Sequence, residues 1–472
     1  MLRTADPVAT VDGMDLEKLL VQAAQNAARY RATVGNRPVA PTGPVEAVRA
    51  AFAGPLPDRP TAPDRVLEEL QDAAYDGLTG TAGPRYFGFV IGGALPAATA
   101  AEILTVAWDQ PAYNEVLSPA AGAAERAAGA WAKDLLGLPA SASVGFVTGA
   151  QAANTVGLAV GRHRVLREAG WDVERDGLAG APPIRVVASE ERHATVDRAL
   201  RLLGLGTASV APVRAEANGA IDVGHLTEVL AAGAGPTLLC LQAGNVNTGA
   251  CDDFTRAIPL GREYDAWVHV DGAFGLWAAA SRRTAHLTAG VEAADSWGTD
   301  AHKWLNVPYD SGLAFCADPQ AHAETMSYAA AYLTGSGGTD YVLGDVTPES
   351  SRRARGFAVW AALRELGREG VTDLVDRCCA LAGRMADRLA EGGATIHNDV
   401  VLNQVLVGFG DDALTDPVVE AVQRDGTCWV GATTWRGQRL MRVSVSNWTT
   451  TEYDVDVSAE AILRAVASLP AS

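Results

Sequence analysis

Short apolar runs alternate with helical segments through the middle of this chain, and this rhythm constrains the fold more than any other feature. Runs such as VGFVTG (144–149) and TLLCLQAG (237–244) are each followed by a segment with helical periodicity. Short strands that alternate with longer helices are typical of a mainly parallel sheet whose two faces are covered by helices. The sequence therefore predicts an α/β fold, in which ligands bind beyond the carboxyl ends of the strands.

The 472 residues divide into three predicted units. Residues 1–90 combine amphipathic helical patterns with proline-rich connectors, and we expect this segment to wrap over another surface rather than fold alone. Residues 91–365 carry the alternating pattern and form a large domain. Residues 366–472 begin with a helical pattern and continue with short strands, which predicts a small α+β domain with an antiparallel sheet.

The charge balance and the cysteines exclude several classes of protein. The chain has 38 Lys and Arg residues against 56 Asp and Glu residues, and this negative surface repels the phosphate backbones of nucleic acids. No apolar run reaches the roughly 18 to 20 residues that span a bilayer. The N-terminal segment lacks the apolar core of a secretory signal, so we expect a cytoplasmic protein. The six cysteines have no metal-ligand spacing, which favours reduced thiols over disulfides or a metal site.

The segment VTGAQAAN (147–154) ends a predicted strand and begins a helix. Gly149 allows a tight turn, and small residues after it leave the N–H groups of the helix start exposed, which makes an anion site. The spacing matches neither the dinucleotide fingerprint nor the P-loop, so a dinucleotide or a nucleoside triphosphate is disfavoured. An ordinary strand-to-helix turn is the alternative for this segment alone.

Three ionisable residues follow predicted strands: His193, Asp271 and Lys303. His193 comes near a helix start, where an ordinary surface histidine is the alternative. Asp271 ends the run VHVD, and because an unpaired buried carboxylate is costly, it either caps a helix or faces a positive group. Lys303 lies in SWGTDAHKW (296–304), and it is either a solvated surface lysine or an amine held out of water.

Together these parts suit one ligand, pyridoxal 5′-phosphate (PLP). PLP would be contacted by four kinds of group: an anion-binding helix start, a carboxylate that needs a cation, an aromatic side chain that stacks, and an amine held out of water. Its phosphate would bind the helix start, its protonated pyridine nitrogen would pair with Asp271, and its aldehyde would form a Schiff base with Lys303. No single fragment requires this ligand, but the ordered set of His193, Asp271 and Lys303 does.

The motifs VHVDGAFG and SWGTDAHKW, with SEERHATVDRALRLLGLG upstream, resemble those of the group II PLP-dependent decarboxylases, which include aromatic L-amino acid decarboxylase and glutamate decarboxylase. The resemblance runs from about residue 84 to about residue 456. It implies the aspartate-aminotransferase fold (fold type I), with a seven-stranded, mainly parallel sheet. It also implies a carboxy-lyase that acts on an L-amino acid, and a homodimer with its active site at the subunit interface.

The same resemblance implies roles for individual residues. Lys303 would carry the Schiff base, Asp271 would pair with the pyridine nitrogen, His193 would stack on the ring, and Ala273 would touch its other face. The phosphate would be held by Ala150, Gln151 and His302. Relatives often have Asn at position 300, and because a carboxylate repels phosphate, we expect Asp300 to lie outside the phosphate shell.

The segment AYLTGSGGTDYVLGD (331–345) is rich in glycine and lacks periodicity, which predicts a mobile loop that closes the site against water. The resemblance places a loop tyrosine over the ring, so Tyr332 and Tyr341 are the candidates for the acid that protonates Cα. Simple packing of a lid is the alternative for each. Tyr341 is favoured slightly, because related enzymes with Phe after the loop Asp tend to make aldehydes. Amine formation is thus predicted, with oxidative deamination to an aldehyde as the alternative.

Substrate identity is weakly encoded. The segment RYFGFVIGGALP (85–96) resembles the substrate pocket of the family, where Phe89 and Val90 would be apolar walls, helped by Trp108. Packing in the core is an equal alternative for each aromatic residue. An apolar pocket favours an aromatic or bulky apolar amino acid over glutamate. Transamination is a further alternative, for which Arg442 is the candidate to clamp the substrate carboxylate.

Overall fold

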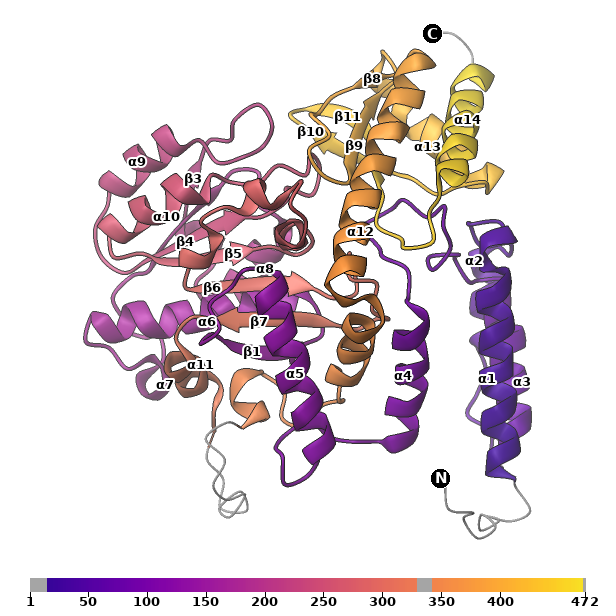
Figure 1. Ribbon diagram of the computed structural model, residues 1–472, viewed down its shortest axis with the longest axis horizontal. Coiled ribbons are helices and arrows are strands. Elements are labelled where there is room, and N and C mark those ends of the chain that lie inside the picture. The colour runs from indigo at the N-terminus through magenta and orange to yellow at the C-terminus, as the bar shows by residue number, and fades with distance from the viewer. Residues whose placement is uncertain (1–14, 329–341, 470–472) are drawn as a thin grey trace.

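The computed structural model describes residues 15–328 and 342–469 of the chain. Its centre is a seven-stranded sheet in the order β1-β7-β6-β5-β4-β2-β3 (Figure 1). The strands are β1 (Ser143–Val147), β2 (Arg185–Ser189), β3 (Val210–Val213), β4 (Thr237–Gln242), β5 (Trp267–Asp271), β6 (Ser296–Asp300) and β7 (Gly312–Cys316). Only β7 among them runs antiparallel to its neighbours β1 and β6. The predicted seven-stranded, mainly parallel sheet is therefore confirmed.

Helices cover both faces of this sheet. As a result, β1, β4, β5, β6 and β7 are buried along their whole length. On one face, a hydrophobic cluster joins the strands to α6 (Ala150–Glu168), α7 (Val173–Asp176), α8 (Ala194–Leu202) and α11 (Pro319–Met326). On the other face, a larger cluster involves α4 (Pro96–Trp108), α5 (Pro119–Leu135), α9 (Val223–Ala231), α10 (Phe254–Glu263) and α12 (Gly356–Glu391). The carboxyl ends of the parallel strands stay uncovered by this packing and can hold a site.

A second, four-stranded antiparallel sheet follows in the order β10-β11-β9-β8. Its strands are β8 (Thr395–Ile396), β9 (Gln404–Gly408), β10 (Gly431–Trp435) and β11 (Gln438–Ser444), and α13 (Thr415–Asp425) and α14 (Glu452–Ser468) accompany them. Helix α12 connects the two sheets and is broken at Gly367, which has φ +60°. The boundary predicted after residue 365 lies beside this break. The small C-terminal α+β unit is as the sequence predicts.

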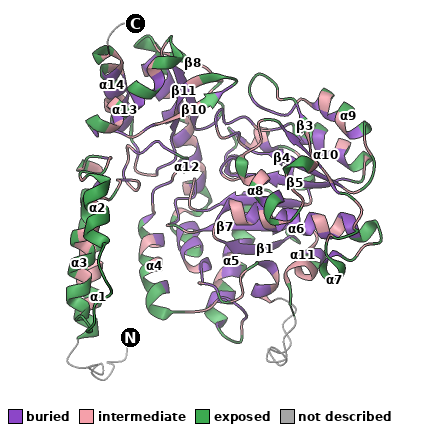
Figure 2. Cartoon of the chain, turned by 180° about the vertical axis from the view of Figure 1, so that it is seen from behind, coloured by how far each residue is buried: buried purple, intermediate pink, exposed green. Residues whose placement is uncertain are grey.

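Helices α1 (Leu16–Thr33), α2 (Val45–Phe52) and α3 (Pro63–Tyr75) lie to one side of the rest of the chain (Figure 1). None of the three contains a buried residue, and they are largely green in Figure 2. Short contacts tie the segment to the body, such as the bond from Arg31 Nη2 to Ala94 O (2.6 Å). That residues 1–90 wrap over another surface stays a prediction.

Short 3₁₀ helices fill the connections, at Val34–Asn36, Thr207–Ser209, Gly275–Ala280, Ala285–Thr288, Val291–Ala293, Leu343–Val346 and Asp412–Leu414. All six cysteines are free thiols. Within residues 15–328 and 342–469, no helix combines the length and the apolarity that crossing a membrane requires.

Candidate active site

A cavity of about 290 Å³ lies where β5 and β6 end and where α6 and α8 begin. It is about the size of the smaller ligand pockets found in proteins. The residues that line it include Thr148, Gly149, Ala150, Gln151, His193, Thr195, Gln242, Gly244, Val246, Asp271, Ala273, Phe274, Asp300, His302 and Lys303. The predicted cofactor residues therefore all line one cavity at the carboxyl edge of the sheet.

Lys303 lies in the turn that follows β6, and Asp300 is the last residue of that strand. The Lys303 side chain is 19% exposed, and its Nζ lies 3.1 Å from Asp300 Oδ2. Its indole neighbour Trp304 is buried in the core. The lysine is thus enclosed and paired with a carboxylate, which is not the environment of a solvated surface lysine.

The start of α6 forms one wall of the cavity. Gly149 caps the helix, and the backbone N–H of Ala150 donates to Asp300 Oδ1 at 2.5 Å. A Cβ at Gly149 would lie 2.9 Å from His302 Cε1, so a larger residue there would push the imidazole away. The His302 Nδ1 accepts from the Ser311 N–H (3.1 Å), which leaves Nε2 facing Asp300 Oδ1 at 3.3 Å. Helix start, imidazole and amine therefore converge on one small volume.

Asp271 ends β5 and is only 4% exposed. Its Oδ1 accepts from the Ala273 N–H (3.2 Å), and its Oδ2 accepts from the Thr195 hydroxyl (3.4 Å). Thr195 also contacts His193 Nδ1 at 2.8 Å. Thr195 therefore fixes the carboxylate and the imidazole relative to each other.

A layer of buried polar groups supports Asp271 from below. Asn154 Nδ2 donates to the Thr195 hydroxyl (3.3 Å), and Asn154 Oδ1 lies 3.0 Å from His269 Nε2. His269 Nδ1 lies 2.9 Å from the Ser296 hydroxyl. Because His269 is fully buried, its pKa falls to about 3 and the ring is neutral. Strands β5 and β6 and helices α6 and α8 are thus joined beneath the cavity.

Two imidazoles face the cavity in neutral form. Burial lowers the pKa of His193, Asp271 opposes this, and the positive charges of Lys303 and Arg442 lower it further. Burial also lowers the pKa of His302, although Asp300 acts in the opposite direction. Neutral imidazoles can stack on a ring or donate one hydrogen bond without adding charge.

These groups fit PLP by their chemistry. The N–H groups at a helix start suit the phosphate, a buried carboxylate suits a protonated pyridine nitrogen, and an enclosed amine suits the aldehyde. The Asp271 carboxylate accepts its two hydrogen bonds from neutral donors, so neither donor is a cation that would compete with a cationic ligand.

The predicted substrate residues lie elsewhere. Phe89 is 65% exposed and stacks on Trp429 (ring centroids 5.5 Å apart), whereas Val90 is buried in the main core. Trp108 ends α4, is half exposed and makes an edge contact with Phe357. None of the three lines the cavity around Lys303. Tyr332 and Tyr341 lie outside the described residues.

Sequence reasoning did not single out three residues that shape the site. Thr195, Gln242 and Phe274 line the cavity. Gln242 ends β4, and Thr195 lies at the start of α8, two residues after His193. Their positions at a strand end and a helix start are the sequence signal that could identify them. Asp300, which we expected outside the phosphate shell, has its carboxylate on the first amide of α6.

The fold and the site define a PLP-dependent enzyme of fold type I. The chain belongs to the pyridoxal-dependent decarboxylases, because the family model "Pyridoxal-dependent decarboxylase conserved domain" matches residues 46–408. It is a PLP-dependent amino acid decarboxylase, a carboxy-lyase whose cofactor is PLP.

Relatives in this family differ in their substrates. The chain is 27% identical to the aromatic-L-amino-acid decarboxylase of Bacillus atrophaeus, over 74% of this chain and 72% of that protein. It is 26% identical to an acidic amino acid decarboxylase of Mus musculus, over 76% of this chain and 66% of that protein. The crystal structure of Oryza sativa TDC with PLP and tryptamine has the same fold, with a TM-score of 0.88, 24% identity, and coverage of 98% of this chain and 99% of that one.

Proposed function

We propose that this enzyme decarboxylates an aromatic or bulky apolar L-amino acid to the amine and carbon dioxide. The observation that carries the assignment of the site is that Lys303, Asp271 and His193 line one cavity at the carboxyl edge of the sheet. Bound there, PLP would supply an electron-accepting pyridinium ring. The cytoplasmic location expected from the sequence stays a prediction.

In this proposal the Lys303 amine would hold the cofactor through its aldehyde, the same group that would bind the substrate amine. Asp271 would keep a proton on the pyridine nitrogen, since its two oxygens accept from neutral donors and neither donor is a competing cation. His193, whose pKa is lowered by burial, would stack on the ring, and Ala273 would touch the other face. Each of these groups holds or moves a proton, or orients the ring.

The phosphate in this proposal lies at the start of α6. Ala150 would supply the backbone N–H that now donates to Asp300, Gln151 a second polar group, and His302 the N–H on Nε2. The Gln151 side chain donates to Thr195 O (3.2 Å), so it reaches across from α6 to α8. The helix dipole adds to the attraction for an anion at this position.

A single chemical test addresses the lysine. The chain contains only three lysines, Lys18, Lys133 and Lys303. Borohydride reduction of the holoenzyme followed by peptide mapping should place the reduced cofactor on Lys303 alone. Lys133, whose ammonium donates to Ala140 O and Ala142 O, serves as the matched control. A cofactor found on Lys18 or Lys133 contradicts the assignment.

The preference for an aromatic substrate is supported by a groove of about 360 Å³ between Phe89 and the small domain. Phe89 and Trp429 form one aromatic wall, and Arg442 lies in the same groove. Arg442 Nη1 donates to the carbonyl of Val246, which lines the Lys303 cavity, so groove and cavity meet at this residue. A panel of amino acids incubated with holoenzyme, with products identified by mass, tests the preference. Faster turnover of glutamate or aspartate than of tryptophan, tyrosine or phenylalanine contradicts it.

Amine formation depends in this proposal on a loop tyrosine, with Tyr341 slightly favoured over Tyr332. Replacing Tyr341 by Phe should lower the yield of amine and raise the yield of aldehyde, and Tyr332→Phe is the matched control. Amine, aldehyde and peroxide are measured together. Dominant aldehyde from the unaltered enzyme supports the alternative reaction, and accumulation of pyridoxamine phosphate without carbon dioxide supports transamination, in which Arg442 would clamp the substrate carboxylate.

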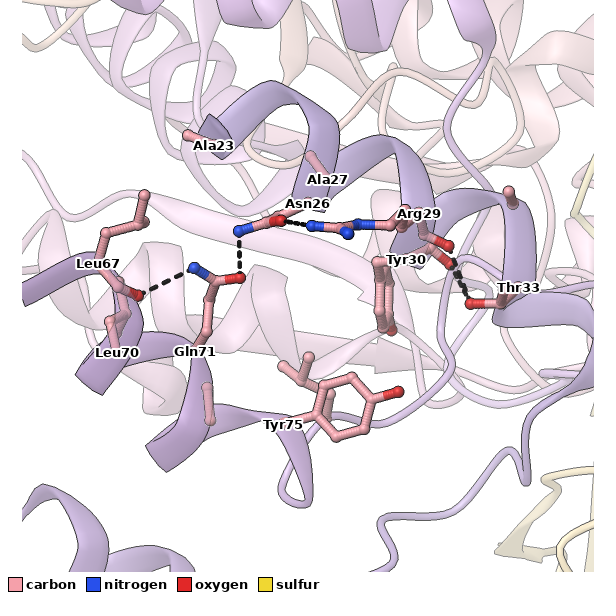
Figure 3. A pocket seen from close by; sticks show the side chains of 13 residues that line it. Ala23, Asn26, Ala27, Arg29, Tyr30, Thr33, Leu67, Leu70, Gln71 and Tyr75 are labelled. Carbon is pink, nitrogen blue, oxygen red and sulfur yellow. Dashed lines mark hydrogen bonds between the residues drawn. The ribbon is translucent and has the colours of Figure 1, made fainter. Parts of the chain in front are cut away.

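The homodimer is proposed on the exposed apolar surface of the N-terminal helices. Between α1 and α3 lies a hollow of about 730 Å³, lined by Tyr30, Leu67, Leu70 and Tyr75 among others (Figure 3). Leu20 on α1 is also exposed. Contiguous apolar surface of this kind marks an interaction site. Analytical ultracentrifugation of the full chain should give a dimer, and a Leu20→Asp, Leu70→Asp variant should weaken it. A monomer at all concentrations contradicts the proposal.

A further inference from the structure

Asp300 occupies an unusual position for a negative charge, because it lies where the proposed phosphate site begins. Its side chain is only 3% exposed. Oδ1 accepts from the Ala150 N–H at 2.5 Å and lies 3.3 Å from His302 Nε2, while Oδ2 lies 3.1 Å from Lys303 Nζ. One carboxylate therefore contacts the helix start, the imidazole and the amine that the cofactor also requires.

The backbone around Asp300 prevents this carboxylate from moving away. Its N–H donates to Ala273 O (2.9 Å), and its carbonyl accepts from the indole N–H of Trp277 (3.0 Å). The residue also pairs with Gly312 of β7 across the sheet. The side chain is enclosed, so rotation into solvent is not available to it. An anion that binds at the start of α6 has to share the site with this carboxyl group.

Two anions in one enclosed site raise each other's pKa, and two carboxylates that share a site commonly retain one proton between them. A phosphate monoester has its second pKa near 6, so around pH 7.5 it is largely a dianion. We propose that cofactor binding takes up one proton, which is held between the Asp300 carboxyl group and the phosphate at the start of α6. The proposal rests on the phosphate position given above.

Other charged or titratable groups face the same volume. They are His302 and Lys303 from the turn after β6, Tyr309 and Asp310 further along the same connection, His193 at the N-cap of α8, Asp271 from β5 and Arg442 from β11. Burial lowers the pKa of both histidines, and burial raises the pKa of the Tyr309 phenol, so these three groups are neutral around pH 7 to 8. Lys303 contacts Asp300 directly (3.1 Å), so a phosphate-free probe measured on both proteins is needed to report any effect of the substitution that does not involve the phosphate.

Pyridoxine 5′-phosphate is a suitable probe, because it lacks the aldehyde and cannot bond to Lys303. Its Kd is measured on the full chain, freed of cofactor, between pH 7 and 8.5, for the unaltered protein and for Asp300→Asn. Calorimetry in buffers of different ionisation enthalpy counts the protons directly. Uptake of one proton makes Kd rise about tenfold per pH unit. We expect this slope in the unaltered protein, a flatter slope in Asp300→Asn, and about tenfold tighter binding by the variant at pH 8.

Pyridoxine, which has no phosphate, is the matched control, and its binding should show the same pH dependence in both proteins. Equal proton uptake by both proteins with the phosphate probe, or weaker binding by Asp300→Asn, overturns the proposal. A loss of affinity for both probes would mean that Asp300 only holds the helix start in place, which overturns it too. If Asp300→Asn does not fold, proton uptake by the unaltered protein is compared between the two probes. One more proton taken up with pyridoxine 5′-phosphate than with pyridoxine supports the proposal, and equal uptake overturns it. If borohydride mapping places the cofactor on Lys303 but no extra proton is taken up, only this inference is refuted and the proposed function stands.

Discussion

Acidification should destabilise this protein through His269, a histidine buried beneath the active site. Its exposed fraction is zero, Nδ1 lies 2.9 Å from Ser296 Oγ, and Nε2 lies 3.0 Å from Asn154 Oδ1. With Asn154 Oδ1 as acceptor, Nε2 carries the hydrogen and Nδ1 accepts from the serine. Both contacts suit the neutral ring, and burial lowers the pKa of His269 to about 3. Protonation would place an unpaired charge in the core.

The sign and the size of the effect follow from proton linkage. In the unfolded chain a histidine takes up its proton near pH 6.5, whereas in the native state His269 stays neutral to about pH 3. Between these values the unfolded state binds more protons, so the free energy of unfolding falls as the pH falls. Between pH 7 and pH 5 the expected loss from this one group is about 2 kcal/mol.

Urea unfolding at pH 7 and pH 5 measures this loss, with the protein concentration held constant because oligomers unfold in a concentration-dependent way. His269→Gln removes the titrating group, and His286→Gln is the matched control because His286 is exposed. We expect the unaltered protein and His286→Gln to lose about 2 kcal/mol more than His269→Gln over this interval. An equal loss in all three proteins would refute the reasoning, since the acid sensitivity would then come from other groups.

Three further changes have expected outcomes. Lys303→Ala should lower carbon dioxide release by several orders of magnitude, and near-normal activity would contradict the role of Lys303. Glu125→Gln should lower the free energy of unfolding in urea by about 3 to 5 kcal/mol, because it removes the carboxylate of a buried bidentate pair with Arg352 (2.7 and 2.8 Å). A loss below about 1 kcal/mol, typical of surface pairs, would contradict this. Gly88→Ala should displace the Trp429 ring, because a Cβ at this position would overlap it. We expect a higher KM for aromatic substrates and a changed near-UV circular dichroism spectrum. An unchanged KM together with an unchanged spectrum would contradict the proposed groove.

The central sheet could be predicted from the sequence because its strands are buried on both faces and therefore read as short continuous apolar runs. β4 (TLLCLQ) and β7 (GLAFC) are clear examples, since every residue in them is buried. β3 gives a weaker signal for a physical reason. It has four residues, contains Pro212, lies at the sheet edge and has only one buried residue, so it does not form a continuous buried apolar run.

The cavity could be predicted in outline because each cofactor residue lies at or shortly after the end of a strand, or at the start of a helix. Parallel strands bring such ends to one edge, so Asp271 and Lys303 line the same cavity although 32 positions separate them in the sequence. The groove beside it could not be predicted in this way. Phe89 and Trp429 come from segments far apart in the chain, and their contact depends on how the small domain packs. Local patterns contain no information on that packing.

Asp300 illustrates why a pairwise argument from sequence falls short in a dense site. A carboxylate and a phosphate repel each other, and from the sequence this suggests keeping them apart. The structure adds the partners that the sequence does not place: the Ala150 amide, the His302 imidazole and the Lys303 ammonium all contact this carboxylate. Three donors contact this carboxylate on one side, and the incoming phosphate approaches from the other. In our proposal the site responds by taking up one proton between the two anions, and the chain does not move. The charge that a residue carries in such a site is therefore a property of the whole cluster, which is why the number of protons taken up is the informative measurement.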